Sequence, residues 1–370
     1  MDVAKRNDIS PTRTKMKTIF RKLNFFLGVS LLAATACVEP SEKIAAAQSE
    51  KIEPYMRVLR TDDGKIELQI AVRKFVSTRG KGPAIWLAAT SHLGETNYYA
   101  ALQKHLDAQS LVLFEGVRER HGPKEKQNGV PKKNSAPAKK TSGRNDPMFD
   151  KKTAAELSPL QSNMAKSLGL VFQLEAIDYD RQHFRNSDLS ISQLMKLMDG
   201  TPVKPGEKTS EAGKDFENLV EAMNGDSILA TVMNFVFKII GSDPKFQAMA
   251  KLMLIETFDQ IKGDLSQLQG LPGGMQELLR IIIQERNKQV MLDLKKAVKE
   301  VSPSESISIF YGSGHMDDLE KRIKLELGYR PDKQIWLSAF SINTRQTGLS
   351  AGEVEMVRSM IKWQAGLMRR

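Results

Sequence analysis

Residues 84–92, AIWLAATSH, and residues 307–315, ISIFYGSGH, are two versions of one pattern. In each, a run of apolar residues breaks at small residues and ends in a histidine. A short apolar run that is bounded in this way is typical of a buried strand. In open α/β sheets, ligand and catalytic groups gather at the carboxyl ends of the strands. The two runs therefore predict strands that deliver His92 and His315 to one edge of a sheet.

The similarity continues after both histidines. Each is followed by a stretch with helical character and a second apolar run, ETNYYAALQKHLDAQSLVLFEG in the first copy and DDLEKRIKLELGYRPDKQIWLSAF in the second. The position of Glu115 relative to His92 corresponds to that of Ser338 relative to His315. We expect an α/β fold whose central mixed sheet is built from two duplicated β-turn-helix-β units. His92, Glu115 and His315 would then converge at one edge.

The remaining chain has a different pattern on each side of these units. Residues 56–77 alternate between apolar and polar positions around Asp63-Gly64, which predicts a β-hairpin. A 3.6-residue period between about Ala154 and Val301 predicts a large helical insertion that joins the two halves. Many of the 17 methionines lie there, and they indicate either an adaptable groove for a peptide or lipid or the insertion's own core.

The net charge of +11 is concentrated in two segments. Seven Lys/Arg and two Asp/Glu precede Cys37, and residues 118–152 contain eleven Lys/Arg and four Asp/Glu. The rest of the chain is close to neutral, so we expect no nucleic-acid partner. Residues 118–152 are also poor in large apolar residues, which predicts a disordered basic loop.

The N-terminus has the pattern of an export signal. Lys17, Arg21 and Lys22 precede the apolar run FFLGVSLLAATA, which is too short to span a bilayer. Met16 opens a better signal than Met1, and is a candidate for the true start. The run stops at the only cysteine of the chain, and ATAC resembles a bacterial lipobox, with Cys37 as the lipidated residue. The alternative is ordinary cleavage after the A-x-A of residues 34–36, which would release a free secreted protein.

Lipidation of Cys37 would anchor the protein to a bacterial membrane in the cell envelope by an attached palmitate. By resemblance to known lipoproteins, Val38 favours the outer membrane, on its periplasmic side, in a host that has one. The expected organisation is a signal peptide (1–36), a lipidated cysteine with a flexible tether (37–53), a first α/β half (54–117), the basic loop (118–152), the helical insertion (153–301) and a second α/β half (302–370).

The order of four motifs resembles that of the TraB/GumN/Tiki family. These are the first strand-histidine unit, the FEG that contains Glu115, the helical IQERNKQVM, and FYGSGHMDDLEKRI followed by LGY. The family pattern has two GxxH motifs, a glutamate that ends a strand, and an ERN on a helix before the second GxxH. Here the first motif has Ala89 in the glycine position, while the second keeps Gly312. The resemblance implies an EreA/ChaN-like fold.

The resemblance also implies a metal-dependent protease. Two neutral imidazoles and a carboxylate on rigid strand ends suit a divalent metal with an open position for water. His92, His315 and Glu115 are therefore candidate ligands, with Glu115 an alternative base, and Zn, Mn, Co or Fe(II) would suit this set. Carried over from the ERN motif, Arg286 and Asn287 would point into the same site. Arg286 would hold a substrate carboxylate or a developing oxyanion.

Each assignment has a structural alternative. Either histidine could cap the helix that follows it. Glu115 could pair with Arg118 or Arg286, while Arg286 and Asn287 could only join the insertion to the sheet. Glu95 is a possible general base, although a carboxylate at a helix start also favours the helix dipole. The histidines without partner spacing are expected at the surface, and they are His105, His121 and His183.

Two functions from different classes therefore remain. One is a lipid-anchored metallohydrolase that cleaves a peptide or amide bond. The other is a non-catalytic lipoprotein that binds a peptide, haem or iron in the same cleft, as relatives of the family imply. The sequence contains no GxSxG, Walker, HExxH or paired CxxC motif, which disfavours a serine hydrolase, nucleotide chemistry and a cysteine-based metal centre.

Overall fold

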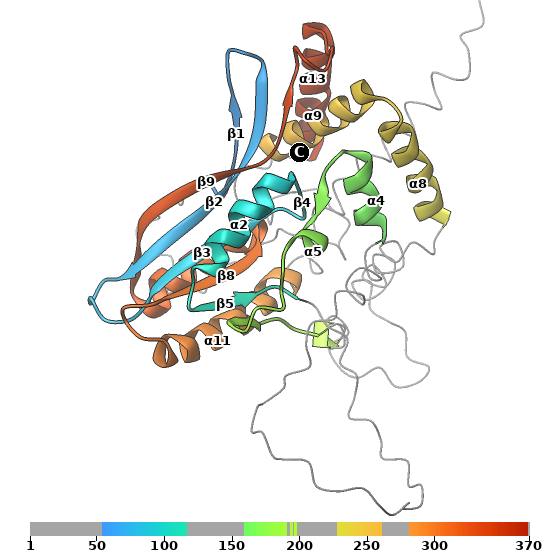
Figure 1. The fold of residues 1–370 in the computed structure, drawn as a ribbon. Helices are drawn as coiled ribbons and strands as arrows, with labels where there is room; N and C mark the ends of the chain where they lie inside the picture. The colour runs from blue at the N-terminus through green and yellow to red at the C-terminus, as the bar shows by residue number, and fades with distance from the viewer. Residues whose placement is uncertain are drawn as a thin grey trace, which may run out of the picture.

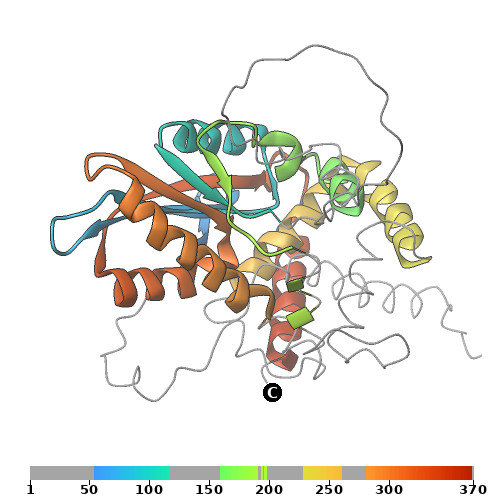
Figure 2. The same ribbon diagram turned by 90° about the horizontal axis from the view of Figure 1, so that it is seen from below.

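The computed structural model describes residues 54–116, 159–190, 193–194, 196–197, 228–260 and 281–368. Their centre is a seven-stranded mixed sheet with helices on both faces (Figures 1 and 2). The strand order is β1-β2-β3-β8-β5-β7, and β9 pairs with the other side of β2. The predicted α/β class with a central mixed sheet is confirmed.

The sheet begins with the predicted hairpin. Strands β1 (Met56–Arg60) and β2 (Lys65–Ser77) are antiparallel, with Met56 opposite Ile70. Gly64 has a φ of 86° in the turn, a conformation that a residue without a Cβ adopts at little cost. The long strand β2 pairs along its second half with β3, which connects the hairpin to the parallel part of the sheet.

The parallel part consists of four strands that run in one direction. They are β3 (Ala84–Thr90), β8 (Ser306–Gly312), β5 (Leu111–Phe114) and β7 (Phe184–Asn186). Most of their apolar side chains are buried, as expected for a parallel sheet that is covered on both faces. Helix α2 (Thr96–Asp107) covers one face, and α11 (Arg286–Glu300) and α12 (Met316–Arg322) cover the other (Figure 2).

The two histidine units share this sheet but occupy different places in it. In the first unit, β3 is followed by α2 and by β5, which pairs with β8. In the second, β8 is followed by η3 (Ser313–His315), α12 and η4 (Ile323–Leu327), and then by β9 (Tyr329–Asn343). Strand β9 lies antiparallel to β2 along its whole length. The two units therefore have the same order of elements and different strand neighbours.

The stretch for which we predicted a helical insertion also contains two short strands. Its described helices are α4 (Pro159–Ser167), α5 (Gln173–Ala176), α8 (Ile228–Gly241), α9 (Pro244–Gln260), the π-helix η2 (Ile281–Glu285) and α11. Strand β7 extends the main sheet, and β6 (Val171–Phe172) pairs with β4 (Leu93–Gly94), beside His92. The sequence did not reveal these two strands, because a two- or three-residue strand is too short to show a period of two.

Helix α9 packs against α13 (Ala351–Met368) and reaches β1, so the insertion is joined to the hairpin end of the sheet (Figure 1). None of the helices in the described ranges has the length and hydropathy needed to cross a bilayer. The signal peptide with Met16, the lipidated Cys37, the tether and the basic loop 118–152 lie outside the described residues.

Candidate functional site

The ends of three neighbouring parallel strands bring His92, His315 and Glu115 together. Thr90 at the end of β3 is opposite Gly312 at the end of β8, and Glu115 directly follows β5. Nε2 of His315 lies 3.9 Å from Oε1 of Glu115. A positive charge on His92 would lower the pKa of Glu115 and of His315, which indicates that His92 lies near both. The predicted convergence at one sheet edge is therefore what the structure contains.

The two histidine motifs are offset by one residue across the sheet. Ala89 is opposite Tyr311, so Gly312 is opposite Thr90 and not opposite Ala89, its counterpart in the sequence pattern. Ala89 is fully buried within β3, and Gly312 has a φ of −52°, which an alanine also adopts. Alanine at position 89 therefore fits an extended strand without backbone strain.

His315 is fully buried and held through one ring nitrogen. Its Nδ1 lies 2.7 Å from Oδ1 of Asn287, and an amide oxygen can only accept a hydrogen bond. Nδ1 therefore carries the proton, and Nε2 presents a lone pair. That Nε2 is buried and has no hydrogen-bond partner among the described residues. Burial, partly offset by Glu115, lowers the pKa of His315 to about 3, so the ring is neutral.

His92 is held in a similar way from the other side. Its Nδ1 lies 3.1 Å from Oε1 of Gln173, and Nε2 of Gln173 donates to the hydroxyl of Tyr179 at 2.9 Å. The backbone N–H of Gln173 also donates to the carbonyl of His92 at 2.9 Å. Gln173 is therefore oriented by Tyr179, and its amide oxygen favours a proton on Nδ1 of His92. Nε2 of His92 is then an acceptor, as in His315.

Glu115 is compensated by Arg286. Nη2 of Arg286 donates to Oε1 of Glu115 at 2.6 Å, and the backbone N–H of Gly312 donates to Oε2 at 2.7 Å. Burial raises the pKa of Glu115, but Arg286, the two histidines and the Gly312 N–H outweigh it and lower the pKa to about 2. Glu115 is thus a carboxylate at all physiological pH values.

Arg286 is shared between two carboxylates. Its Nε donates to Oδ1 of Asp188 at 2.8 Å, and Nη2 reaches Oδ2 at 2.6 Å, which is a bidentate pair. The side chain of Asp188 is fully buried, and that of Arg286 is 5% exposed. With Glu115, the three groups have a net charge of −1. The alternative in which Glu115 pairs with Arg286 is therefore what the structure contains, and the guanidinium is directed at protein carboxylates.

Asn287, the next residue of α11, links that helix to the second histidine unit. Its Nδ2 donates to Oδ2 of Asp318 at 2.8 Å and to the carbonyl of His315 at 3.1 Å. Neither histidine caps a helix with its side chain: His315 forms no cap hydrogen bond, and Glu95 occupies the N-cap position after His92. The capping alternative is therefore wrong for both histidines.

Glu95 occupies the N-cap of α2 without capping it. Its Oε1 accepts hydrogen bonds from the backbone N–H of Ser341 at 2.8 Å and from the Ser341 hydroxyl at 3.3 Å. The carboxylate thus ties the segment after His92 to β9. The group that we considered as a general base or dipole partner is engaged in this strand contact.

The other histidines are less exposed than we predicted. The ring of His105 lies 4.8 Å from that of Trp86, and burial lowers its pKa to about 4. His183 is partly buried, with Nε2 3.3 Å from the carbonyl of Leu106. Both were expected at the surface. His105 lies on α2, which packs on the sheet, whereas His183 lies in the turn before β7. His121 lies outside the described residues.

Sequence reasoning missed the residues that orient the site. They are Asp188, Gln173, Tyr179, Asp318 and Tyr311, whose ring lies 5.2 Å from that of His315. Asp188 lies two residues after the end of β7, and Glu115 directly follows β5, so a polar residue close after a strand was the available signal. Because β7 has only three residues, FRN, its strand character is not visible in the sequence.

The donor atoms partly fit a divalent metal. Two imidazoles are each held at Nδ1 by an amide oxygen, and hydrogen bonding at the second ring nitrogen is characteristic of metal-ligating histidines. The buried Nε2 of His315 also needs a partner. However, Glu115 already accepts from Arg286 and Gly312. Within the described ranges, no three His, Cys, Asp or Glu side chains are arranged closely enough to hold a metal as they stand.

No family model, curated protein or solved structure matches this chain. The resemblance to the TraB/GumN/Tiki family therefore rests on the order of its motifs alone.

Proposed function

We propose that this protein is a lipid-anchored, metal-dependent hydrolase that cleaves a peptide or amide bond, as its resemblance to the TraB/GumN/Tiki family implies. The observation that carries the proposal is the pair of imidazoles. Each is held at Nδ1 by a side-chain amide oxygen, which leaves Nε2 as an acceptor, and Nε2 of His315 lies 3.9 Å from Oε1 of Glu115. Hydrogen bonds at the second ring nitrogen orient metal-ligating histidines in the same way. A bound metal would also provide the partner that the buried Nε2 of His315 lacks among the described residues.

In this proposal His92 and His315 would hold the metal through Nε2, and Glu115 would be the third ligand. When bound, the metal would supply Lewis acidity and a water of lowered pKa. The residues around it orient and balance the donors. Gln173 and Asn287 set the tautomers, and Arg286 forms ion pairs with Glu115 and Asp188. The net charge of −1 on these last three groups would attract a cation.

The same contacts limit the roles of two residues. Glu115 has a pKa of about 2, so it is a poor general base near neutral pH, and a ligand role suits it better. Arg286 is buried against Glu115 and Asp188, so it would act on the reaction by positioning Glu115 and not by holding a substrate carboxylate.

The second candidate is a binding protein that holds a peptide, haem or iron at the same place without turnover. The observation in its favour is that both oxygens of Glu115 are already engaged and its proton affinity is low. Capture of a ligand in a fixed ratio, without product and without an effect of chelators, would support this candidate over the hydrolase.

The proposal also includes the evolutionary origin of the two histidine units and the cellular location of the protein. The two histidine units share an element order, which an internal duplication in an EreA/ChaN-like ancestor would explain. Lipidation at Cys37 would place the domain at a membrane of the bacterial cell envelope, and at the outer membrane, facing the periplasm, in a host that has one.

Elemental analysis of the purified protein, prepared without a histidine tag, tests the proposal. We expect close to one Mn, Co, Zn or Fe per chain in the natural protein and none in the His92→Ala/His315→Ala variant. His183→Gln is the matched control, because its ring lies outside the site, and it should retain the metal. Absence of metal from the natural protein after reconstitution with all four ions, with the fold intact by circular dichroism, would reject a metal site.

A further inference from the structure

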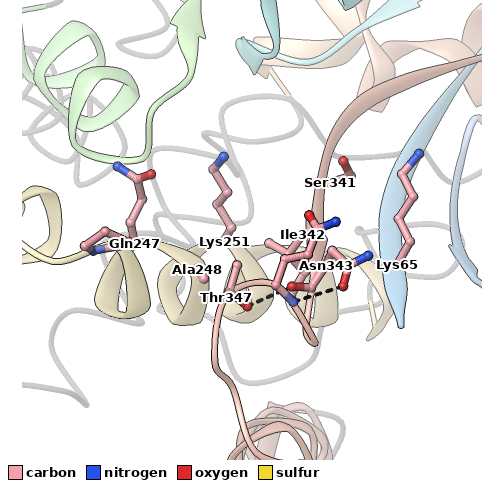
Figure 3. Close-up of a pocket in the computed structure, with 10 residues that line it drawn as sticks. Lys65, Gln247, Ala248, Lys251, Ser341, Ile342, Asn343 and Thr347 are labelled. Carbon is pink, nitrogen blue, oxygen red and sulfur yellow. Dashed lines mark hydrogen bonds between the residues drawn. The ribbon is translucent and has the colours of Figure 1, made fainter. Parts of the chain in front are cut away.

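A pocket of about 460 Å³ lies away from the histidine site, between the start of β2, the first turns of α9 and the end of β9 (Figure 3). None of His92, Glu115 and His315 lines it. Pockets of roughly 300–1,000 Å³ are typical of small-molecule sites. The volume is therefore sufficient for a ligand of metabolite size.

The pocket is positively charged. Its lining contains Lys65 and Lys251 and no Asp or Glu. The two lysines come from different elements, β2 and α9, and Figure 3 shows their side chains extending in the same direction on either side of Ser341. Two ammonium groups that face one space favour an anion between them.

Of the two lysines, Lys251 provides the stronger evidence for a bound anion. It is half-buried, and its ammonium group makes no hydrogen bond or ion pair with the described residues. Burial lowers the pKa of Lys251, and the carboxylate of Glu95, which accepts a hydrogen bond from the lining residue Ser341, offsets this only in part. Lys65 has one distant partner, Glu67, at 3.6 Å. A partly buried ammonium without a direct partner is costly, and a bound anion would remove that cost.

The rest of the lining can complete a ligand site. The side chains of Gln247, Asn343, Gln346 and Thr347 are polar, and Ile342 and Ala248 supply apolar surface. Nε2 of Gln247, Oδ1 of Asn343 and the hydroxyl of Thr347 already form hydrogen bonds within the protein. The first amides of α9 are not available, because Asp243 already accepts from the N–H groups of Lys245 and Phe246. Attraction of an anion therefore depends on the two lysines and not on the end of the helix.

We propose that this pocket binds a small molecule through a carboxylate or phosphate group held between Lys65 and Lys251. The proposal concerns different residues from the metal site, so either can fail without the other. Lysine acts here as a compact point charge, which suits both anions.

Competitive acetylation of the full chain, measured by mass spectrometry, tests the proposal, with inorganic phosphate and succinate as probes. We expect at least one probe to slow acetylation of Lys65 and Lys251 by several-fold. Lys296, which is 67% exposed and lies on α11, is the internal control and should react at an unchanged rate. Protection by phosphate alone would identify phosphate compounds as the ligand class, and protection by succinate alone would identify carboxylates.

Variants provide the second measurement. Isothermal titration with the protective probe should show binding weakened by about tenfold or more in Lys251→Met and Lys65→Met, the scale of one lost charge-assisted contact. Lys296→Met should bind as the natural protein does. Because Lys251 has no bonded partner in the described ranges, Lys251→Met should fold normally. The proposal is overturned if neither probe protects the two lysines, or if both pocket variants bind the probe with unchanged affinity.

Discussion

Nδ1 of His315 and Oδ1 of Asn287 lie 2.7 Å apart, and the orientation of that amide is set by a third residue, since Nδ2 of Asn287 donates to Asp318 at 2.8 Å. The helix that ends the insertion therefore determines which nitrogen of a buried histidine carries the proton.

In Asn287→Leu, the fixed tautomer of His315 should be lost. The natural protein should show a neutral His315 ring with its proton on Nδ1 between pH 5 and 8, because its pKa is lowered to about 3. The variant lacks the acceptor and should contain both tautomers. Long-range ¹H–¹⁵N spectra of the imidazoles measure this directly. Lys288→Gln, on the exposed side of the same helix, should leave the spectrum unchanged. An unchanged tautomer in Asn287→Leu would show that another group orients the ring.

Acid should destabilise the protein through its buried histidines. The pKa of His315 is lowered from 6.5 to about 3, so between these values the unfolded chain binds the extra proton and stability decreases as pH falls. The contribution is complete above pH 6.5. At pH 5 the loss from His315 is about 2 kcal/mol relative to neutral pH. His105, with a pKa of about 4, adds to the same window.

Urea denaturation at pH 7 and pH 5 measures this effect. The pH-dependent loss should be smaller by about 2 kcal/mol in His315→Gln than in the natural protein. His183→Gln should keep the full loss. Equal pH dependence in His315→Gln and the natural protein would mean that His315 becomes protonated without unfolding.

Replacement of Arg286 by methionine should strongly destabilise the protein. The change leaves the carboxylates of Glu115 and Asp188 buried without a counter-charge. Removal of one partner from a buried ion pair costs about 3–5 kcal/mol. Arg185→Met removes a surface pair with Glu300 and should cost less than about 1 kcal/mol. Urea denaturation at neutral pH compares the two variants, and a cost for Arg286→Met similar to that for Arg185→Met would contradict a structural role for this pair.

Gln173→Leu should weaken metal binding if the proposed site exists. Loss of the Oε1 contact frees the ring of His92 to change tautomer and orientation. Residues that orient a metal-ligating histidine typically contribute about 10–100-fold to affinity. Competition with a chelating dye measures the dissociation constant. Gln289→Leu removes a glutamine that bonds Asp293 and should have little effect. If Gln173→Leu retains full affinity, His92 is not held through Nδ1 in the way that the structure indicates.

Cys37→Ser should abolish membrane attachment. Cells labelled with an alkyne analogue of palmitate should yield a labelled natural protein in the membrane fraction and an unlabelled variant. The His183→Gln variant serves as the control for expression and should be labelled normally. A natural protein that is exported, unlabelled and soluble would instead support ordinary cleavage after residue 36.

Much of the fold was predictable from the sequence. The strands that contain residues 84–90, 111–114 and 306–312 are buried on both faces, and so they appear as continuous apolar runs. The hairpin was predictable because Asp63-Gly64 is a strong turn motif between alternating strands. These patterns also placed His92, Glu115 and His315 at one sheet edge.

Other features depended on neighbours that are remote in the sequence. Strand β7 and the pairing of β9 with β2 could not be predicted, because three residues show no periodicity and a strand's partner is not encoded next to it. The surface position expected of His105 was wrong because its partner Trp86 belongs to another element.

By itself, therefore, the sequence determined the hairpin, the strands with continuous apolar runs and the polar residues that follow those strands. Periodicity and turn chemistry are local properties, so they can be evaluated from a single chain. Only the tertiary structure decided the state of those polar residues: the protonated nitrogens of His92 and His315, and the ionisation of Glu115 beside Arg286 and Asp188. The physical reason is that burial and Coulombic interaction depend on distances in space between groups that the chain separates by up to about two hundred residues.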